Sequence, residues 1–122
     1  MEREILVVDD SESIREVVKF TLENNGYKVT LGNDGKHAMN YLDGRHFDVI
    51  ITDLHMPEMD GIELIKKARS KSEYSAIPIL FLTTESQVTK KIEAKDAGAT
   101  GWIIKPFAPQ KLILALNKVI KH

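Results

Sequence analysis

The sequence predicts an α/β domain in which a parallel sheet is covered by helices on both faces. Short apolar runs alternate along the chain with longer stretches of helical periodicity. Three of the runs are apolar throughout, which is typical of strands buried on both faces of a sheet. Five strand–helix pairs in this order predict five parallel strands joined by right-handed crossovers, with helices on both sides.

Four apolar runs have the length of buried strands, and a weaker fifth run lies between the first two. The four strong runs are Ile5–Val8, Val49–Ile51, Ile79–Leu82 and Trp102–Ile104, and the weaker one is Tyr27–Leu31. The apolar residues at helical spacing that separate them are Ile14, Val17, Val18, Thr21 and Leu22, then Ala38, Met39, Tyr41 and Leu42, then Ile62, Ile65 and Ala68, then Val88, Ile92 and Ala97, and finally Leu112, Ala115, Leu116, Val119 and Ile120.

Polar residues and glycines mark several helix ends. Ser13 with Glu16 predicts a capping box for the first helix, and Asp60 with Glu63 predicts a cap for the third. Gly26 and Gly98 follow the first and fourth helices, where glycine ends helices most often. The fourth helix has the fewest large apolar residues, so we expect it to pack most loosely and to move most easily.

Composition narrows the function classes. The 122 residues fit a single domain over residues 1–122, with no effector domain expected. Charged residues make up 29% of the chain with a net charge of −1, which argues against an electrostatic nucleic-acid binder. The chain has no cysteine, its first residues lack the pattern expected of a secretory leader, and its apolar runs are too short to cross a bilayer. We therefore expect a cytoplasmic protein.

Polar residues follow four of the predicted strands at their carboxyl ends. They are Asp9 and Asp10 after the first strand, Asp53 after the third, Thr83 after the fourth and Lys105 after the fifth. Carboxyl ends of parallel strands meet at one edge of the sheet, where α/β proteins place their sites. Three carboxylates there repel one another without a cation. Hard oxygen ligands suit Mg²⁺, and a hydroxyl and an ammonium suit phosphoryl oxygens, so the set predicts phosphoryl transfer to a carboxylate.

Each of these residues also has a purely structural explanation when taken alone. Asp9 and Asp10 fit a turn or a helix cap, and Asp53 fits a turn before Pro57. A lone threonine such as Thr83 usually satisfies nearby backbone groups. Lys105, next to a proline, fits an ordinary surface loop. The functional interpretation therefore depends on the group of residues as a whole.

Four strings in the chain resemble the receiver domains of two-component response regulators. They are ILVVDD at Ile5–Asp10, DLHMPEMDG at Asp53–Gly61, FLTTES at Phe81–Ser86 and GATGWIIKPF at Gly98–Phe107. The last two strings, together with the expectation of no effector domain, are most similar to stand-alone chemotaxis regulators of the CheY type. The resemblance implies a flavodoxin-like fold with five parallel strands in the order 2-1-3-4-5.

The resemblance implies a role for each residue at the strand ends. Asp53 would accept the phosphoryl group from a histidine kinase, and Thr83 and Lys105 would contact the phosphoryl oxygens. Asp9, Asp10, Asp53 and the backbone carbonyl of His55 would hold Mg²⁺. The chain would catalyse only the transfer to its own Asp53 and its autodephosphorylation, so we do not expect an enzyme in the usual sense.

Further residues acquire roles from the same resemblance. Thr83 and Trp102 would form the switch, although core packing is an alternative explanation for Trp102. His55 and Glu85 would overhang the phosphoryl group and tune its hydrolysis, or else be plain loop residues. The bond between Lys105 and Pro106 would be a cis peptide bond, which proline makes affordable.

Two other function classes fit the sequence less well. A phosphohydrolase of the haloacid dehalogenase type uses a similar set, but it keeps a second Asp two residues after the nucleophile, where this chain has His55. A flavin- or nucleotide-binding module would need a glycine-rich phosphate loop, and no GxGxxG or GxxxxGK[ST] string exists.

The output of a receiver is a separate question. We expect a monomer whose partners are a CheA-like histidine kinase, a flagellar motor switch protein and a phosphatase. A phosphorelay shuttle or a receiver that acts on another effector is the alternative. The expected contact face is the fourth helix, fifth strand and fifth helix, with Trp102 and the surface lysines Lys90, Lys91 and Lys118. Direct binding to nucleic acid and membrane insertion are not expected.

Overall fold

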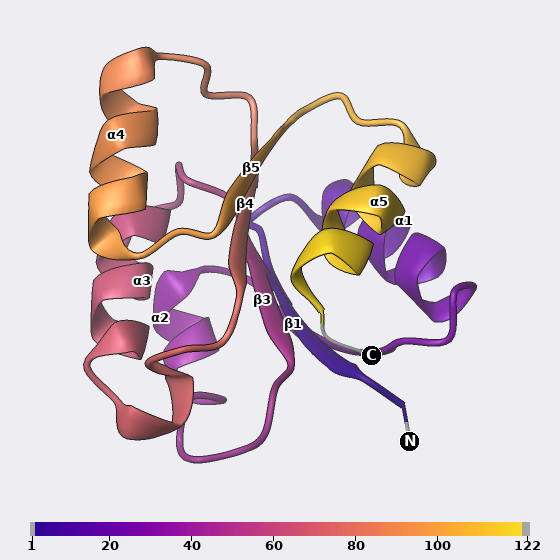
Figure 1. Ribbon diagram of the computed structural model, residues 1–122, viewed down its shortest axis with the longest axis horizontal. Helices are drawn as coiled ribbons and strands as arrows, with labels where there is room; N and C mark the ends of the chain where they lie inside the picture. Colours follow the sequence, from indigo (N-terminus) through magenta and orange to yellow (C-terminus); the bar gives the residue numbers. More distant parts are fainter. Residues whose placement is uncertain (1, 121–122) are drawn as a thin grey trace.

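The computed structural model describes residues 2–120, which form a five-stranded sheet between two helical layers (Figure 1). The strands are β1 (Glu4–Val8), β2 (Lys28–Gly32), β3 (Val49–Thr52), β4 (Ile79–Thr83) and β5 (Gly101–Ile104). The helices are α1 (Glu12–Glu23), α2 (Gly35–Met39), α3 (Gly61–Arg69), α4 (Val88–Ala97) and α5 (Pro109–Val119), with a short 3₁₀ turn, η1 (Ser72–Tyr74), before β4.

All neighbouring strands pair in parallel, and their order is β2-β1-β3-β4-β5. This confirms the predicted fold class, together with the strand order that the family resemblance implied. The order places β1 and β3 side by side at the centre, with Val8 beside Thr52. The carboxyl ends of these two strands therefore deliver Asp9 and Asp53 to neighbouring positions.

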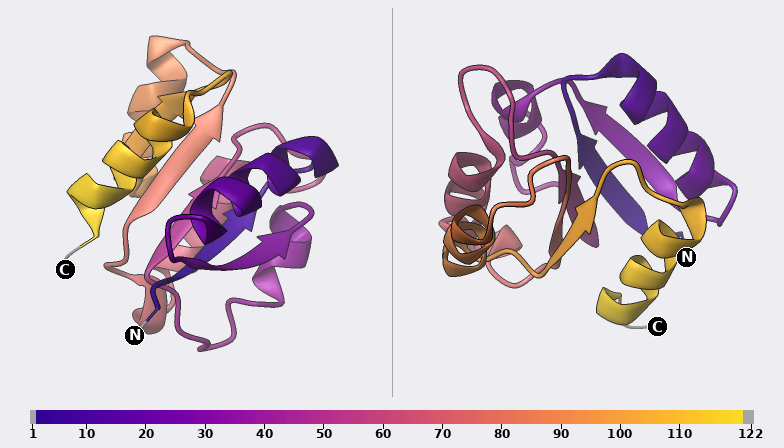
Figure 2. Two further views of the ribbon diagram at one scale, coloured as in Figure 1. Left: turned by 90° about the vertical axis from the view of Figure 1, so that its right-hand side faces the viewer. Right: turned by 90° about the horizontal axis from the view of Figure 1, so that it is seen from above.

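Each face of the sheet has its own apolar core. Alternate strand residues such as Leu6, Ile50 and Phe81 pack under α2, α3 and α4. The intervening residues, such as Val7 and Ile51, pack under α1 and α5. The views in Figures 1 and 2 show these two helical layers on opposite sides of the sheet. The continuous apolar runs of the sequence follow from this double burial.

The start of α1 differs from the prediction. Ser11, and not Ser13, is the N-cap, because its extended backbone (φ −91°, ψ 116°) lets its hydroxyl accept a hydrogen bond from the N–H of Ile14. Ser13 already lies inside the helix, and its hydroxyl is 3.1 Å from that of Ser11. The predicted cap of α3 is confirmed, since Asp60 Oδ1 accepts from Glu63 N at 2.8 Å.

Two other helices also differ in detail. Helix α2 ends at Met39, so Tyr41 and Leu42 lie in the turn that follows and not in the helix. In α4 the apolar spacing marks the buried face only in part: Val88 and Ile92 are 69% and 55% exposed, Ala97 is partly buried against the core, and the fully buried residue is Ala94. Gly98 caps α4 in the left-handed conformation (φ 115°), as predicted. No helix within residues 2–120 combines the length and apolar character needed to cross a bilayer.

Gly61 is required where α3 begins beneath the site. A Cβ at this position would overlap the carbonyl oxygen of Asp53 and come within 2.5 Å of Phe81 Cε1. Neither neighbour can yield easily, since one is backbone and the other a buried ring. We expect Gly61→Ala to lower the free energy of unfolding, measured in urea, by about 2 kcal/mol. Gly26→Ala is the matched control, because Gly26 has φ 87° but open space around it, and should cost about 1 kcal/mol. An equal or smaller cost at Gly61 would contradict the proposed overlap.

Candidate functional site

Backbone hydrogen bonds just beyond the strand ends fix the residues of the site. Asp9 N donates to Gly32 O, Asp53 N to Val8 O, and Lys105 N to Thr83 O, at 2.9–3.1 Å. Each bond extends the parallel ladder by one residue, so these backbones are as constrained as the strands themselves. The side chains that follow β1, β3 and β5 therefore meet at one edge of the sheet.

Three carboxylates meet at this edge. Oxygen atoms of Asp9, Asp10 and Asp53 all lie within 4.8 Å of one another. Asp9 is buried, with 2% of its surface exposed, whereas Asp10 is exposed and Asp53 is intermediate. Carboxylates this close repel one another, and hard oxygen donors on one side of a crevice form a suitable site for a divalent cation such as Mg²⁺.

Lys105 is the cation that the structure places among these acids. Its Nζ lies 2.6 Å from Asp9 Oδ2 and 3.1 Å from Asp53 Oδ2, and its side chain is only 10% exposed. Burial alone would lower the pKa of Lys105, but the hydrogen bond to Asp9 and the charges of Asp53 and Asp9 outweigh burial and raise that pKa. Lys105 is therefore firmly protonated. The Lys105–Pro106 peptide bond is cis.

Asp9 is held ionised only at a cost. Burial raises its pKa, and the hydrogen bonds from Lys105 and from Ser11 N only partly offset this effect. The backbone carbonyl of Asp9 also accepts a hydrogen bond from Arg15 Nη1 at 2.7 Å. Ser11 and Arg15 were not predicted as part of the site. The signal was available for Arg15, because it lies one helical turn after the N-cap and faces back toward the strand end.

Asp53 has one carboxylate oxygen tied to backbone and one directed at Lys105. Oδ1 accepts from Leu54 N at 2.7 Å, while Oδ2 faces Lys105. The side chain is 13% exposed, so solvent or a small reactant can reach it. The neighbouring Thr52 is fully buried, and its hydroxyl donates to the Asp53 carbonyl oxygen at 2.9 Å. A carboxylate held in this way has the fixed position that a nucleophile needs.

Thr83 lies at the end of β4, fully buried. Its hydroxyl oxygen accepts from Glu85 N at 3.2 Å, so it is engaged with the following loop. Thr84 is exposed. Of the two threonines, only Thr83 therefore ties the end of β4 to the loop that follows, and it does so through Glu85.

His55 and Glu85 form a pair across the crevice. His55 Nε2 lies 2.8 Å from Glu85 Oε1, and the two residues come from the loops after β3 and β4. The other Glu85 oxygen accepts from Ser86 N and Gln87 N. Hydrogen bonds from Gln87 N and from His55 lower the pKa of Glu85. We expected both residues near the site but missed that they contact each other, because no pattern in the sequence reports a contact between two loops.

Trp102 is half-buried on β5, beside Phe81 of β4, with the ring centroids 5.2 Å apart. Its indole Nε1 donates to the backbone carbonyl of Glu85 at 3.0 Å. Lys91 Nζ of α4 lies 5.9 Å from the ring centroid. Trp102 thus both packs on the core and holds the loop that contains Glu85. The structure supports the packing explanation of Trp102, and the indole contact leaves its switching role a prediction.

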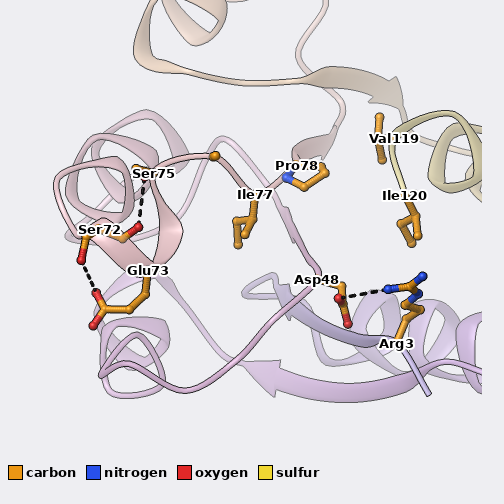
Figure 3. A pocket seen from close by; sticks show the side chains of 10 residues that line it. Arg3, Asp48, Ser72, Glu73, Ser75, Ile77, Pro78, Val119 and Ile120 are labelled. Carbon is orange, nitrogen blue, oxygen red and sulfur yellow. Dashed lines mark hydrogen bonds and ion pairs between the residues drawn. The ribbon is translucent and has the colours of Figure 1, made fainter. Parts of the chain in front are cut away.

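A separate hollow of about 430 Å³ lies away from the acids, between the start of β1, the segment before β4 and the end of α5 (Figure 3). An ion pair between Arg3 and Asp48, 3.7 Å long, spans one side of it. Ile77, Pro78 and Ile120 supply much of the rest of its lining. It contains no residue of the strand-end set, so we assign it no part in that chemistry.

Comparison with known proteins agrees with this geometry. Residues 5–117 match the family described as the response regulator receiver domain. The chain is 43% identical to the chemotaxis protein CheY1 of Helicobacter pylori, covering 95% of each chain. It is 39% identical to the protein PetR of Rhodobacter capsulatus, but there it spans only 48% of the relative's length.

Solved structures give the same result. The chemotaxis protein CheY4 of Vibrio cholerae superposes with a TM-score of 0.95 at 46% identity, over 98% of this chain and 100% of that one. The receiver domain of the Pseudomonas aeruginosa sensor histidine kinase PA1611, with a magnesium ion coordinated in its active site cleft, superposes with a TM-score of 0.90 at 28% identity, over 98% of each chain. The match along almost the whole chain and the acids at the strand ends lead to one conclusion: the chain belongs to the response regulator receiver domain family.

Proposed function

We propose that Asp53 accepts a phosphoryl group from a histidine kinase in a Mg²⁺-dependent reaction and thereby changes the output surface of the protein. The observation that carries the proposal is Lys105 Nζ, which lies within 3.1 Å of both Asp9 and Asp53 inside a cluster of three carboxylates. The Asp53 carboxylate oxygen attacks phosphorus, the phosphorus–nitrogen bond of the phosphohistidine breaks, and the imidazole leaves with the electron pair and takes up a proton. Hydrolysis by water later returns the Asp53 carboxylate and inorganic phosphate.

Asp9, Asp10, Asp53 and the carbonyl of His55 would hold the magnesium ion. Their donor set fits this ion, which prefers a few carboxylates and keeps water or phosphate oxygens in its remaining positions. The bound ion would supply neutralisation of the charge that develops on the phosphoryl oxygens. Lys105 would neutralise the charge on another side, and the hydroxyl of Thr83 would donate to a phosphoryl oxygen once it leaves Glu85 N.

The switch would follow from these same contacts. If Thr83 turns to the phosphoryl group, the loop held by Glu85 loses one of its hydrogen bonds. Trp102 contacts the same loop through the Glu85 carbonyl, so the change would reach β5 and α4. Phosphorylation would then favour one of two arrangements that exist before it. The output face would comprise α4, β5 and α5, with Trp102 and the surface lysines Lys90, Lys91 and Lys118, of which Lys90 is partly buried.

Chemotaxis is the output we favour. Two similar proteins, CheY1 and CheY4, are chemotaxis proteins, and the first is covered along 95% of its length. The partners would then be a chemoreceptor kinase of the CheA type and a flagellar motor switch protein, with a phosphatase to end the signal. A relay shuttle or another effector stays the alternative, because PetR shows that a chain of this kind also occurs as half of a longer protein. The single-domain organisation, the monomeric state and the cytoplasmic location stay predictions.

A phosphohydrolase of the haloacid dehalogenase type stays the remote alternative. That chemistry needs a general acid two residues after the nucleophile, and His55 at this position is paired with Glu85. The residues at the strand ends fit better with Asp53 as a reversible phosphoryl acceptor than with a hydrolase.

Labelling by a small phosphodonor tests the central proposal. With acetyl phosphate and Mg²⁺, intact mass should show the gain of one phosphoryl group, and the gain should disappear when the metal is chelated. Asp53→Asn should gain none, because its amide is a far weaker nucleophile. Asp60→Asn, at the nearby cap of α3, is the matched control and should label like the wild type. Labelling of Asp53→Asn equal to the wild type would refute the proposal.

Asp9 should make stability depend on pH and on magnesium. Its pKa is raised in the folded chain, so its ionisation opposes folding: without metal, the free energy of unfolding should fall as pH rises through this pKa. At neutral pH without metal, Asp9→Asn should raise the free energy of unfolding, since the amide has no charge to desolvate and its oxygen still accepts from Ser11 N and Lys105.

Added Mg²⁺ should stabilise the wild type by mass action and Asp9→Asn much less. Urea unfolding with and without Mg²⁺ measures both effects. Asp96→Asn, the same change on an exposed residue of α4, is the control and should alter neither. The opposite result would be an Asp9→Asn variant that is less stable than the wild type and is stabilised by Mg²⁺ just as much. It would show that ionisation of the buried Asp9 does not oppose folding.

The contact between His55 and Glu85 should govern the lifetime of the phosphorylated state. Because the pair spans the crevice at 2.8 Å, removing either side chain opens the same path for water to the acyl phosphate. We expect His55→Ala and Glu85→Ala each to change the autodephosphorylation rate about threefold or more. The double variant should change it by no more than the larger single effect, as residues that act as a unit do. Loss of ³²P label over time measures the rate. If the effects of the two single substitutions multiplied in the double variant, His55 and Glu85 would not act as one barrier.

A further inference from the structure

Arg69 lies outside the site and makes an unusual set of contacts. It is the last residue of α3, and its half-buried guanidinium donates only to backbone carbonyls. Nε and Nη2 donate to Gly98 O at 3.2 and 2.7 Å, and Nη1 donates to Tyr74 O at 2.8 Å and Ile77 O at 2.6 Å. Three separate backbone segments, namely the end of α4, the turn η1 and the approach to β4, are thereby tied to the end of α3.

The contact with Gly98 is tight as well as multiple. A Cβ at Gly98 would lie 2.8 Å from Arg69 Nε, so the guanidinium packs directly against the left-handed residue that caps α4. Gly98 O would otherwise be one of the unpaired carbonyls that end a helix. The next residues continue the attachment, since Thr100 N donates to Ile79 O at 2.7 Å and Ile79 N to Thr100 Oγ1 at 3.0 Å.

The two ends of α4 are therefore held by different parts of the molecule. In a strand–helix–strand unit the helix runs antiparallel to the strands, so α4 begins at the edge that carries the acids and ends at the opposite edge, beside α3 (Figure 1). No side chain caps its first turn. Glu85, just before this turn, connects it by hydrogen bonds to His55, Thr83 and Trp102. Its last turn is held by Arg69, and none of the hydrogen bonds of Arg69 involves the site.

The middle of α4 contributes little to holding the helix in place. Ala94 is its buried residue, and Val88 and Ile92 in its first half are largely exposed. A small buried side chain permits rotation more readily than a large one that interlocks with its neighbours. The position of α4 is therefore set mainly at its two ends.

We propose that Arg69 is a positioning residue that makes the end of α4 at Gly98 a fixed pivot, so that signalling turns the first half of the helix and leaves its last turn in place. The inference rests on the proposed function, because the rearrangement starts from Thr83 and Glu85. Its consequence is directional: the change is delivered to Val88, Lys91 and Ile92, which lie at the mobile end, and not to the η1 segment.

Hydrogen–deuterium exchange of the full chain tests the pivot. Beryllofluoride with Mg²⁺ serves as the probe, since it mimics a phosphoryl group on a carboxylate and does not decay. In the wild type, exchange in residues 86–92 should change at least threefold on addition of the probe, while residues 96–100 should change less than about 1.5-fold. A uniform change along the whole of α4 would overturn the proposal, even if no variant could be studied.

Arg69→Lys supplies the second arm, because an ammonium cannot reach all three carbonyls. Exchange in residues 96–100 should become about tenfold faster, which corresponds to the loss of one hydrogen bond of about 1.4 kcal/mol, and the response to the probe should spread into this segment. Arg45→Lys is the matched control: its guanidinium lies over the rings of Tyr41 and Phe47, away from α4, and the gradient should persist. An unchanged gradient in Arg69→Lys would also overturn the proposal.

Labelling with acetyl phosphate separates the two proposals. Arg69→Lys should gain its phosphoryl group at the wild-type rate, because the substitution leaves the acids and Lys105 in place. Failure of the wild type to label would defeat the proposed function itself. Normal labelling with a last turn of α4 that responds as strongly as the first would defeat the pivot alone.

Discussion

The repulsion among three carboxylates at one edge of the sheet is the constraint on which the rest of the structure depends. Parallel pairing of β1 and β3 brings Asp9 and Asp53 together whether or not their charges favour it. Lys105 offsets part of the repulsion between the two carboxylates, because its Nζ lies 2.6 and 3.1 Å from them. Burial nevertheless raises the pKa of Asp9. A cluster with excess negative charge attracts a cation more strongly than a neutral cluster would, so the repulsion among the acids favours occupation of the site by a divalent ion.

The neighbouring loops connect this charged site to the start of α4 and to β5. Glu85 makes contacts in four directions, to His55, to Thr83, to its own helix start and, through its carbonyl, to Trp102. A residue with this many partners cannot adjust to one without disturbing the others. In the proposed switch, a change at Thr83 would act on the first turn of a helix whose fully buried residue is a small one, Ala94. The loose packing of α4 and the tight hold of Arg69 on its far end are thus complementary features.

The sequence was sufficient for the fold and for which residues gather at the site. Apolar runs that are buried on both faces appear directly in the sequence, and the edge rule for parallel sheets then brings Asp9, Asp10, Asp53 and Lys105 together. It was insufficient wherever the answer depended on a contact between loops or on helix rotation. The pair of His55 with Glu85 joins segments 30 residues apart. Val88 and Ile92 have helical spacing, but spacing cannot tell which side of the helix meets the core.

Arg69 shows why some functional contacts leave no mark in a sequence. An arginine at the end of an amphipathic helix normally interacts with the helix's own last carbonyls and with solvent. Here its donors go to carbonyls of other segments, and backbone carbonyls carry no residue identity that a pattern could register. Only Gly98, which must be glycine both for its φ of 115° and for the space that the guanidinium occupies, leaves a trace of the contact. Gly98, the glycine that ends α4, is therefore also the residue through which Arg69 holds the helix.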